Sequence, residues 1–516
     1  MITTAIIIAA ASFQAPAQLP TLFHEATKSA EAGVGLDDVS VRRRLVEIDI
    51  DLLANTIVRS GNTGAINLNL FADESFVASF NKVEQAYGGG WVWHGAVEGA
   101  ADSSALFSVT NGVVAGSIRF SNRLFRVNYA GNNTHWVTEV DELRFKDCGT
   151  TANQKVGGNS HGALHQHNAQ STSGSSTGGT TRGGGANPDV DTMIVYTTSA
   201  KNGQGGTNSM NSLINLAITE TNNGFSQSSV NQRLNLVHTE EMAGYSEPSS
   251  FSTMLSQLRG KSDGKLDNVH SLRDQYGADV VSMFVNGSQY CGIAYMMTNV
   301  SHSFESSAFS VVSRTCATGY YSTAHEFGHN MGSAHDRGNA GSASHSYSYG
   351  FRTANNQYRT IMAYSPGSRI NRWSNPNVTY NGFSMGKINS EENWRSLNDN
   401  DSVVSAWRSH ITPSPILTMP SLIAGWPAQF QVTNVDAGDL LYIGYSLTGN
   451  GPTSTAWGSA NLSPPIYNFP PFIADSTGKG TYTTTVPYAA KGLTVWFQAL
   501  DTNTSLFSNG EVSTVL

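Results

Sequence analysis

The sequence predicts a multidomain protein with a β-rich N-terminal domain, a central α/β domain and a C-terminal β-sandwich. Three observations support this. Short alternating apolar runs fill the first part of the chain. Strand-like and helix-like segments alternate in the middle, and short strands with turn signals return at the end. With 516 residues, the chain is long enough for several cores.

The first β-rich domain is expected at residues 18–148. Its apolar runs are separated by Gly, Asn and Ser, as in an antiparallel sheet: VEIDIDLL, INLNLF, GWVWHGAVEG, GSIRFSN and LFRVNYAG. Residues 149–188 are rich in Gly, Ser, Thr and Asn and hold almost no apolar side chains. We expect this tract to be a flexible linker.

The N-terminal residues 1–17 are interpreted as a signal peptide, so secretion is expected. An apolar stretch from Ala5 to Ala11 precedes Ala15-Pro16-Ala17, which is typical of a small-residue cleavage site. Because no Lys or Arg precedes the apolar stretch, a hydrophobic N-terminus without a targeting role remains the alternative. No later apolar run predicts a membrane span, and no basic block indicates nucleic-acid binding in this chain of net charge -8.

The central α/β domain is expected at residues 189–411. TMIVYTT, LNLVHTEEM and VVSMFV have strand character, and helices are expected at 209–223, 268–276 and 391–409. After the TPSP segment, residues 412–516 return to short strands, which predicts the β-sandwich. This last module has no metal-ligand cluster in its sequence. Polymer binding, surface anchoring and assistance in secretion all remain open roles for it.

The stretch HEFGHNMGSAHD carries the most specific chemical signal. His325 and His329 are four residues apart and therefore share one face of a helix. Glu326 lies beside them, where a carboxylate can take a proton from water. Gly332 permits a positive-φ turn that brings back His335 as a third ligand. Three imidazoles with an open fourth position predict one catalytic zinc ion.

This stretch matches the motif HExxHxxGxxH and resembles the metzincin metallopeptidases. Asp336 after the third histidine resembles the adamalysin/reprolysin branch, and Met362 in RTIMAYS resembles the family's Met-turn methionine. The segments at 347–351 and 374–376 are similar to those of bacterial peptidyl-Asp metalloendopeptidases. The resemblance covers residues 189–410. It implies a twisted mixed sheet, a zinc helix and a Met-turn, with the N-terminal domain as a propeptide.

Two further features follow from the resemblance. Tyr364 stands two residues after Met362, as in the astacin and serralysin branches, which implies a fifth metal ligand or an oxyanion donor. A buried core tyrosine is the alternative. YCGIAYM lies where metzincins place the edge strand that pairs antiparallel with substrate, and an ordinary interior strand is the alternative. The residues expected on this edge are Gly292, Ile293, Ala294 and Tyr295.

The chain has three cysteines. In an oxidising compartment two of them should pair, and a Cys291–Cys316 disulfide ties the edge strand to the segment that enters the zinc helix. Cys148 then remains at the end of the first domain, where related zymogens carry a thiol that binds the zinc. We therefore expect an inhibitory cysteine, with an inert thiol or an intermolecular disulfide as alternatives. Processing is expected within 149–188 by an activating protease.

These features predict a secreted zinc endopeptidase that cleaves extended polypeptides, with zinc-bound water activated by Glu326. The resemblance implies that residues between the third histidine and just past the Met-turn line the pocket after the cut bond, and an arginine there suits an acidic side chain, so cleavage on the amino side of Asp is expected. Arginines that simply face solvent are the alternative. The candidates are Arg352, Arg359, Arg369 and Arg372. The alternatives are a broad-specificity secreted metalloprotease and a non-catalytic surface or adhesion protein on the same scaffold. No sequence loop specifies Ca²⁺, and the oligomeric state stays open.

Overall fold

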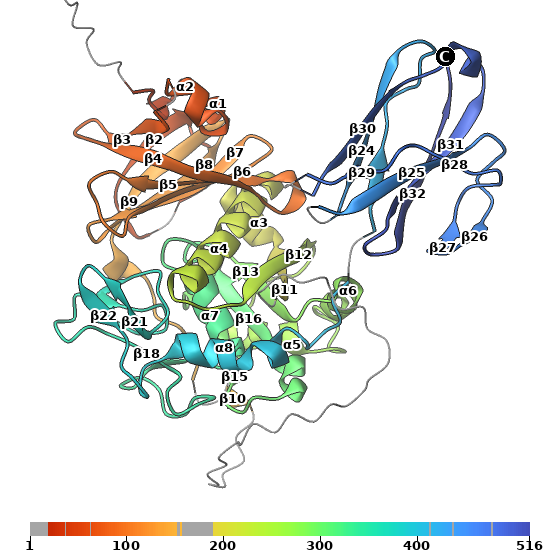
Figure 1. The fold of residues 1–516 in the computed structure, drawn as a ribbon. Coiled ribbons are helices and arrows are strands. Elements are labelled where there is room, and N and C mark those ends of the chain that lie inside the picture. Colours follow the sequence, from red (N-terminus) through yellow and green to blue (C-terminus); the bar gives the residue numbers. More distant parts are fainter. Residues whose placement is uncertain are drawn as a thin grey trace, which may run out of the picture. The chain divides into compact units, whose positions relative to one another are not determined.

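The computed structural model describes residues 19–36, 38–61, 63–151, 155–156, 189–411, 414–435, 438–475 and 478–516. The expected signal peptide and most of the expected linker lie outside these residues. The chain divides into two compact units, Met1–His410 and Ile411–Leu516. Figure 1 colours both along the sequence. None of the described helices is both long and apolar enough to span a membrane.

The N-terminal part of the first unit is one antiparallel sheet in the order β1-β2-β9-β8-β7-β6-β5-β4-β3 (Figure 1). The turns after β6, β7 and β8 have positive φ at both central residues, which suits tight hairpins. The strands are β1 (Phe23–Glu25), β2 (Ser40–Ile48), β3 (Ala65–Phe71), β4 (Glu74–Gln85), β5 (Trp91–Val97), β6 (Ser104–Thr110), β7 (Val113–Phe120), β8 (Arg123–Gly131) and β9 (Thr134–Val140).

The run VEIDIDLL does not form one strand. Its second half begins helix α1 (Ile50–Ala54), which is followed by α2 (Thr56–Arg59). Asp49 caps α1 by accepting a hydrogen bond from the Leu52 amide, and Leu52 and Leu53 are both buried. The local cap therefore outweighs the alternating pattern at this position.

The central part of the first unit is a five-stranded sheet in the order β12-β11-β13-β16-β14. Four strands are parallel, and β14 at one edge is antiparallel to β16. The sheet is therefore mixed. Its strands are β11 (Asp189–Thr197), β12 (Arg233–Met242), β13 (Val280–Val285), β14 (Gly292–Ala294) and β16 (Phe309–Ser313).

Helices cover both faces of this sheet. Ile194 and Tyr196 pack in one cluster with α4, α7 and α8, whereas Met193 and Val195 pack in another with α5 and α6. Alternate residues of β11 thus face opposite helix layers. The helices are α3 (Thr198–Gln204), α4 (Thr207–Gln227), α5 (Phe251–Arg259), α6 (Asn268–Tyr276), α7 (Ser322–Asn330) and α8 (Asn393–Val404).

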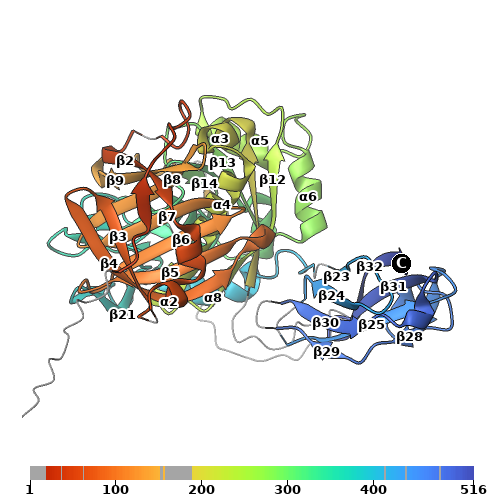
Figure 2. The ribbon, with the colours of Figure 1, turned by 90° about the horizontal axis from the view of Figure 1, so that it is seen from above.

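Helix α4 lies between the two sheets of the first unit. Its Leu216 packs against Leu106 of β6 and Ala115 of β7, and Figure 2 shows the N-terminal sheet beside α4. The helix and strand expected at 268–276 and 280–285 are confirmed. Helix α8 is shorter than the helix expected at 391–409. The sequence pattern had not predicted helices α3 and α5.

Four pairs of short strands complete the described part of the first unit. They are β10 (Lys155–Val156) with β15 (Met296–Met297), β17 (Ala334–Asp336) with β18 (Tyr349–Gly350), β19 (Tyr358–Arg359) with β20 (Ser368–Arg369), and β21 (Asn375–Tyr380) with β22 (Phe383–Met385). The 3₁₀ turns of the first unit are η1 (Tyr87–Gly89), η2 (Glu142–Arg144) and η4 (His302–Ser307).

The second unit holds two antiparallel sheets that share one apolar core around Phe430, Ile443 and Phe497, together with a small hairpin. The first sheet comprises β23 (Ile416–Thr418), β24 (Pro427–Thr433) and β30 (Gly480–Thr485). The second comprises β25 (Leu440–Ser446), β28 (Tyr467–Asn468), β29 (Phe472–Ile473), β31 (Thr494–Asp501) and β32 (Leu506–Thr514). The hairpin is β26 (Thr453–Thr455) and β27 (Gly458–Ala460), and the 3₁₀ turn is η5 (Tyr488–Ala490).

Candidate active site

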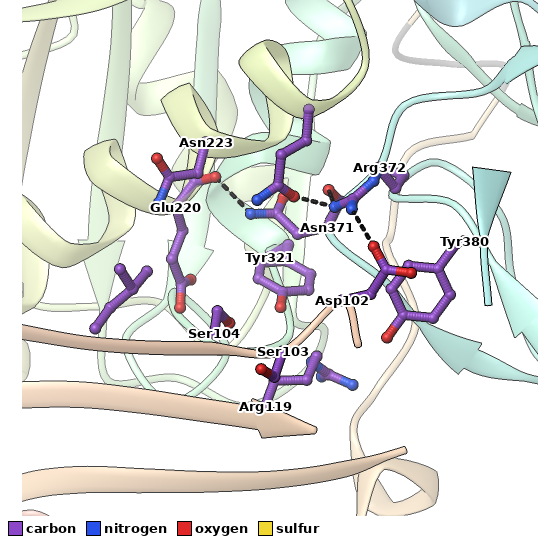
Figure 3. A pocket seen from close by; sticks show the side chains of 12 residues that line it. Asp102, Ser103, Ser104, Arg119, Glu220, Asn223, Tyr321, Asn371, Arg372 and Tyr380 are labelled. Atoms are coloured by element: carbon purple, nitrogen blue, oxygen red, sulfur yellow. Dashed lines mark hydrogen bonds and ion pairs between the residues drawn. The ribbon is translucent and has the colours of Figure 1, made fainter. Parts of the chain in front are cut away.

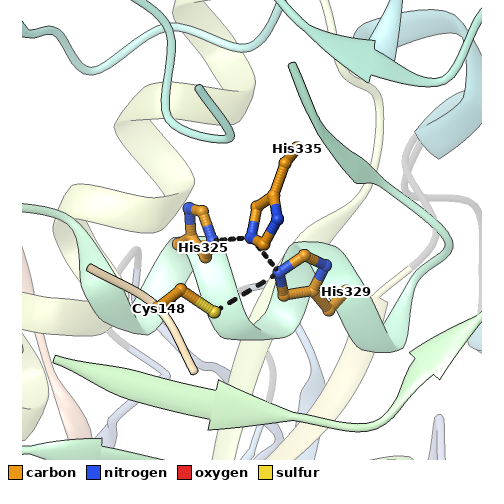
Figure 4. A group of neighbouring side chains, drawn as sticks. All are labelled: Cys148, His325, His329 and His335. Atoms are coloured by element: carbon orange, nitrogen blue, oxygen red, sulfur yellow. Dashed lines mark hydrogen bonds between the residues drawn. The ribbon is translucent and has the colours of Figure 1, made fainter. Parts of the chain in front are cut away.

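Three imidazoles meet at one point beside helix α7. His325 and His329 lie one turn apart on α7, and His335 lies on β17 after a turn at Gly332. Gly332 has φ +95°, and a Cβ there would lie 2.7 Å from the Ser344 hydroxyl oxygen, so only glycine suits this turn. The Nε2 atom of His335 lies 3.0 Å from that of His329 and 3.1 Å from that of His325 (Figure 4).

The hydrogen bonds of the two helical histidines fix their tautomers. His325 Nδ1 lies 2.8 Å from the Ile361 carbonyl oxygen, and His329 Nδ1 lies 2.9 Å from the Ser333 carbonyl oxygen. A carbonyl only accepts, so each Nδ1 carries the proton and each Nε2 presents a lone pair. The Nε2 lone pairs of His325 and His329 converge with His335 Nε2, an arrangement that fits a cation. The donor set therefore suits a zinc ion.

Burial keeps these imidazoles uncharged. The pKa of His325 lies well below its ordinary value because of desolvation and the neighbouring His329, and desolvation lowers the pKa of His329 to about 3. Both rings are therefore neutral at pH 7, which is the form that binds a metal.

Glu326 points toward the same space. A Cβ on Gly292 of β14 would lie 2.5 Å from the Glu326 carboxylate, so this glycine allows the edge strand to lie against the carboxylate. Desolvation raises the pKa of Glu326 to about 8. A divalent cation at the imidazoles favours the carboxylate form and lowers that pKa. Glu326 is thus a buried carboxyl group beside the three imidazoles, and a cation there would ionise it.

Cys148 joins this cluster from the N-terminal part of the chain. Its sulfur lies 3.6 Å from His329 Nε2 (Figure 4) and donates to Glu326 Oε2 at 3.4 Å. The ligand atoms of Cys148 and the three histidines all lie within 4.8 Å of one another. Burial and the charge of Glu326 raise the pKa of the thiol well above its ordinary value, so a thiolate here requires a cation beside it.

The segment that carries Cys148 lies along the sheet edge. The Gly149 amide donates to the Gly292 carbonyl at 2.8 Å, and the Cys291 amide donates to the Asp147 carbonyl at 3.3 Å. The Thr150 hydroxyl accepts from the Ala294 amide and donates to the Ala294 carbonyl. The bonds join residues 147, 149 and 150 to residues 291, 292 and 294 in the same order, so the segment 147–150 runs parallel to β14. The Thr150 contacts had no sequence signal, because strand register is not encoded locally.

Met362 and Tyr364 lie under and beside the histidines. Met362 is fully buried in the core that α7 shares with the sheet, and the ring of Tyr364 lies 4.2 Å from that of His335. The Tyr364 hydroxyl donates to the Cys148 carbonyl at 2.7 Å. Burial raises its pKa, so the hydroxyl keeps its proton. Asp336 Oδ2 accepts the Tyr364 amide at 3.0 Å and thereby positions the turn, a role that the sequence did not suggest.

The four candidate arginines lie in different surroundings. Arg352 pairs with Asp336 at 3.0 Å, and Arg372 pairs with Asp102 of the N-terminal sheet at 3.1 Å (Figure 3). Arg359 and Arg369 are both about 2% exposed and lie around the ring of Tyr320, two residues before α7. A disulfide joins Cys291, just before β14, to Cys316 in the loop that leads to α7.

The N-terminal sheet contacts the loop before α7 through Glu220 of α4. Glu220 accepts hydrogen bonds from the Ser117 hydroxyl at 2.5 Å and from the Gly319 amide at 2.8 Å. Arg119 donates to the Gly319 carbonyl at 2.9 Å. Burial raises the pKa of Glu220 to about 7. This buried carboxyl was missed by sequence reasoning, because its partners lie about 100 residues away on either side.

Comparison with known proteins identifies the family. A family model described as metallo-peptidase family M12 matches residues 186–374. A peptidyl-Asp metalloendopeptidase of Stenotrophomonas maltophilia is 32% identical over 64% of this chain and 79% of its own length. A peptidyl-Asp metalloendopeptidase of Xanthomonas campestris pv. campestris is 32% identical over 65% of this chain and 80% of its own length. The match to a solved structure of metalloproteinase-II from Bacteroides fragilis covers 70% of this chain and 92% of that chain at 10% identity, with a TM-score of 0.35. The chain therefore belongs to metallopeptidase family M12 and is a zinc metalloendopeptidase.

Proposed function

We propose that this chain is a secreted, cysteine-inhibited zymogen of an endopeptidase that cuts extended polypeptides on the amino side of Asp. His325, His329 and His335 hold the zinc ion, and Glu326 moves the proton. The observation that carries this proposal is the convergence of three Nε2 atoms whose opposite ring nitrogens, in the two helical histidines, donate to backbone carbonyls.

When bound, zinc supplies Lewis acidity toward the peptide carbonyl and a water molecule. Glu326 accepts a proton from the attacking water and then gives it to the leaving amine. Its burial supports this role, because a carboxyl with a raised pKa both takes and returns a proton near neutral pH. Gly292 supports it too, since any larger residue would collide with the carboxylate.

Tyr364 acts as an oxyanion donor. Its hydroxyl already donates to a peptide carbonyl next to the histidines, that of Cys148. A substrate carbonyl in the same place would receive the same hydrogen bond, which strengthens as negative charge develops on the oxygen. This contact favours the donor role over that of a fifth metal ligand.

Substrate binds along β14, with Gly292, Ile293, Ala294 and Tyr295 as the expected edge. In latency the segment around Cys148 occupies this edge, and its thiolate binds the zinc. Residues 18–148 are then the propeptide, and cleavage within 149–188 releases it. The contacts of residues 147–150 with the edge strand support this assignment.

Secretion and the accessory module complete the proposal. The signal peptide at 1–17 and the Cys291–Cys316 disulfide suit an oxidising compartment. Residues 412–516 form a β-sandwich module outside the catalytic domain at 189–411. The preference for Asp is supported by the relatives, which are peptidyl-Asp metalloendopeptidases, and by the four candidate arginines, Arg352, Arg359, Arg369 and Arg372.

Glu326→Gln tests the proposed chemistry. The processed variant is expected to keep one zinc ion per chain and to lose about 10²- to 10⁴-fold in kcat. Metal content is measured by atomic emission and activity with a quenched fluorescent peptide. Turnover at the parent rate by a zinc-loaded variant would remove Glu326 from the mechanism.

A further inference from the structure

We infer that Arg372 and the main-chain amide of Asn381 form a carboxylate-binding site on the catalytic domain, through which Asp102 holds the propeptide after the linker is cut. This inference rests on the proposed role of residues 18–148 as a propeptide. It deepens that role, because the release that follows cleavage becomes a second, reversible step. The site uses none of the residues of the histidine cluster or of the edge strand β14.

The Asp102 carboxylate is bound at both of its oxygens. Arg372 Nη2 donates to Asp102 Oδ1 at 3.1 Å (Figure 3), and the Asn381 amide donates to Asp102 Oδ2 at 3.0 Å. Charge-assisted bonds of this kind are among the stronger hydrogen bonds of proteins. The Arg372 side chain is only 11% exposed and that of Asp102 27%, so water screens this pair less than an ion pair on the open surface.

The catalytic domain shapes its side of the site by itself. Asn381 lies in the turn between β21 and β22 with φ +46°, and its side-chain amide donates to the Tyr358 hydroxyl at 3.0 Å. Arg372 Nη1 donates to the side chain of Gln227 on α4. These partners all belong to the catalytic domain, so they hold Arg372 and the Asn381 amide in place when Asp102 leaves. A site that is already formed binds its ligand at a lower entropic cost.

The propeptide presents Asp102 on a closed turn between β5 and β6. Asp102 has φ +53°, a backbone conformation that Asp and Asn adopt more readily than most residues. The Ser103 hydroxyl accepts from the Val97 amide at 3.0 Å and donates to the Val97 carbonyl at 3.1 Å, which ties the two ends of the turn together. The sheet that carries this turn has its own apolar core. Both halves of the site are therefore formed within their own domains.

The interface beside Asp102 is polar and partly hollow. A cavity of about 140 Å³ lies there, and polar side chains from both domains line it, among them Arg119 of the propeptide and Glu220 and Gln227 of the catalytic domain (Figure 3). Permanent interfaces are larger and more apolar, whereas polar interfaces are typical of parts that separate and meet again. In such an interface a well-placed charge pair contributes strongly to affinity and specificity.

A cut in the linker leaves these contacts in place. The Asp102 site uses no residue of the expected linker at 149–188. The same holds for two other bonds between the domains, from the Gly35 amide to the Gly203 carbonyl at 3.0 Å and from the Ser212 hydroxyl to the Val113 carbonyl at 2.9 Å. The cut removes only the covalent connection, and with it the high effective concentration of the propeptide. The two pieces then associate reversibly, and Asp102 contributes to their dissociation constant.

The test uses the full chain with the recognition sequence of a site-specific protease inserted into the linker. Glu326→Gln is present throughout to prevent self-digestion, and electrophoresis verifies that both pieces stay intact. After the cut, size-exclusion chromatography over a dilution series gives the dissociation constant of the two pieces. The parent pieces should co-elute before dilution. Asp102→Asn should raise the dissociation constant about tenfold, because the turn is kept and the ion pair is lost.

Asp73→Asn is the matched control. Asp73 lies in the same sheet but pairs with Arg42 inside the propeptide, so its dissociation constant should stay within about twofold of the parent value. Arg372→Gln should weaken binding as Asp102→Asn does. The double variant should be little weaker than either single variant, because both changes remove one contact.

Parent pieces that separate as soon as the linker is cut would overturn the inference. Co-eluting pieces whose dissociation constant is the same in the parent and in Asp102→Asn would overturn it as well, and so would fully additive effects of the Asp102 and Arg372 changes. If Asp102→Asn does not fold, Asp102→Gly keeps the positive φ and must show the same increase. None of these measurements uses hydrolysis, so a parent chain with Glu326 that cuts no peptide would contradict the proposed function alone.

Discussion

Replacing Cys148 by Ala in the uncut chain distinguishes the contribution of the thiol to inhibition from that of the backbone segment that carries it. The thiol lies within contact distance of Glu326 and His329. The backbone around it is held by other groups, and these remain in the variant. The substitution should therefore give partial rather than full activity, and the size of that activity follows from the remaining contacts.

Five hydrogen bonds hold residues 147–150 on the site without the thiol. Three are the bonds from the Gly149 amide, the Cys291 amide and the Tyr364 hydroxyl, and two join Thr150 to Ala294. At about 0.5–1 kcal/mol net each, they stabilise the closed segment by about 2.5–5 kcal/mol. A difference of 1.4 kcal/mol is a factor of about ten. The open fraction, and hence the activity of uncut Cys148→Ala, should be about 0.03–2% of that of the processed enzyme.

The assay is hydrolysis of a quenched peptide by uncut protein, with electrophoresis to verify that the linker is intact. Uncut Cys148→Ala should exceed the uncut parent at least about tenfold, because under the proposed inhibition the parent adds a thiolate–zinc bond to the same contacts. Cys148→His, which restores a metal ligand, is the control and should stay near the parent. An uncut Cys148→Ala chain no more active than the uncut parent would refute the inhibitory cysteine.

Three further predictions follow from the same contacts. Tyr364→Phe should lower kcat about 10- to 100-fold with unchanged zinc content, and unchanged turnover would exclude the oxyanion role. The pKa of Glu220 is about 7 in the folded chain and about 4.5 in the unfolded chain, so the folded chain binds one more proton between these pH values. The free energy of unfolding of the uncut chain should therefore fall by on the order of 3 kcal/mol as pH rises from about 4.5 to about 7. Glu220→Gln should remove that slope in urea titrations, and an unchanged slope would contradict the assignment. Replacing both Cys291 and Cys316 by Ala removes a disulfide that closes a loop with a sequence separation of 25. The free energy of unfolding should fall by about 3 kcal/mol, which is measured as a lower Tm. An unchanged Tm would argue against a structural role of the disulfide.

The active-site residues close in sequence were accessible to sequence reasoning because helix periodicity fixes their geometry. His325 and His329 share a face of α7, and Gly332 has the positive φ that the motif requires. The pairing of Cys291 with Cys316 was also expected and is present.

Contacts between distant segments were not accessible in this way. Nothing in the sequence near Arg372 indicates a partner at Asp102, 270 residues earlier, and nothing near Arg369 indicates its contact with Tyr320. The alternating run before Leu52 likewise predicted a strand where the cap at Asp49 begins a helix. Register, tertiary partners and burial decide these features, and none of them is local.

The most direct test of the central claim is to incubate the processed, zinc-loaded protein with a complex peptide mixture, with and without a zinc chelator, and to read the cut positions by mass spectrometry. The account predicts cuts that disappear with the chelator and that concentrate on the amino side of Asp. Chelator-resistant cuts, or no cuts from zinc-loaded protein lacking its propeptide, would contradict it.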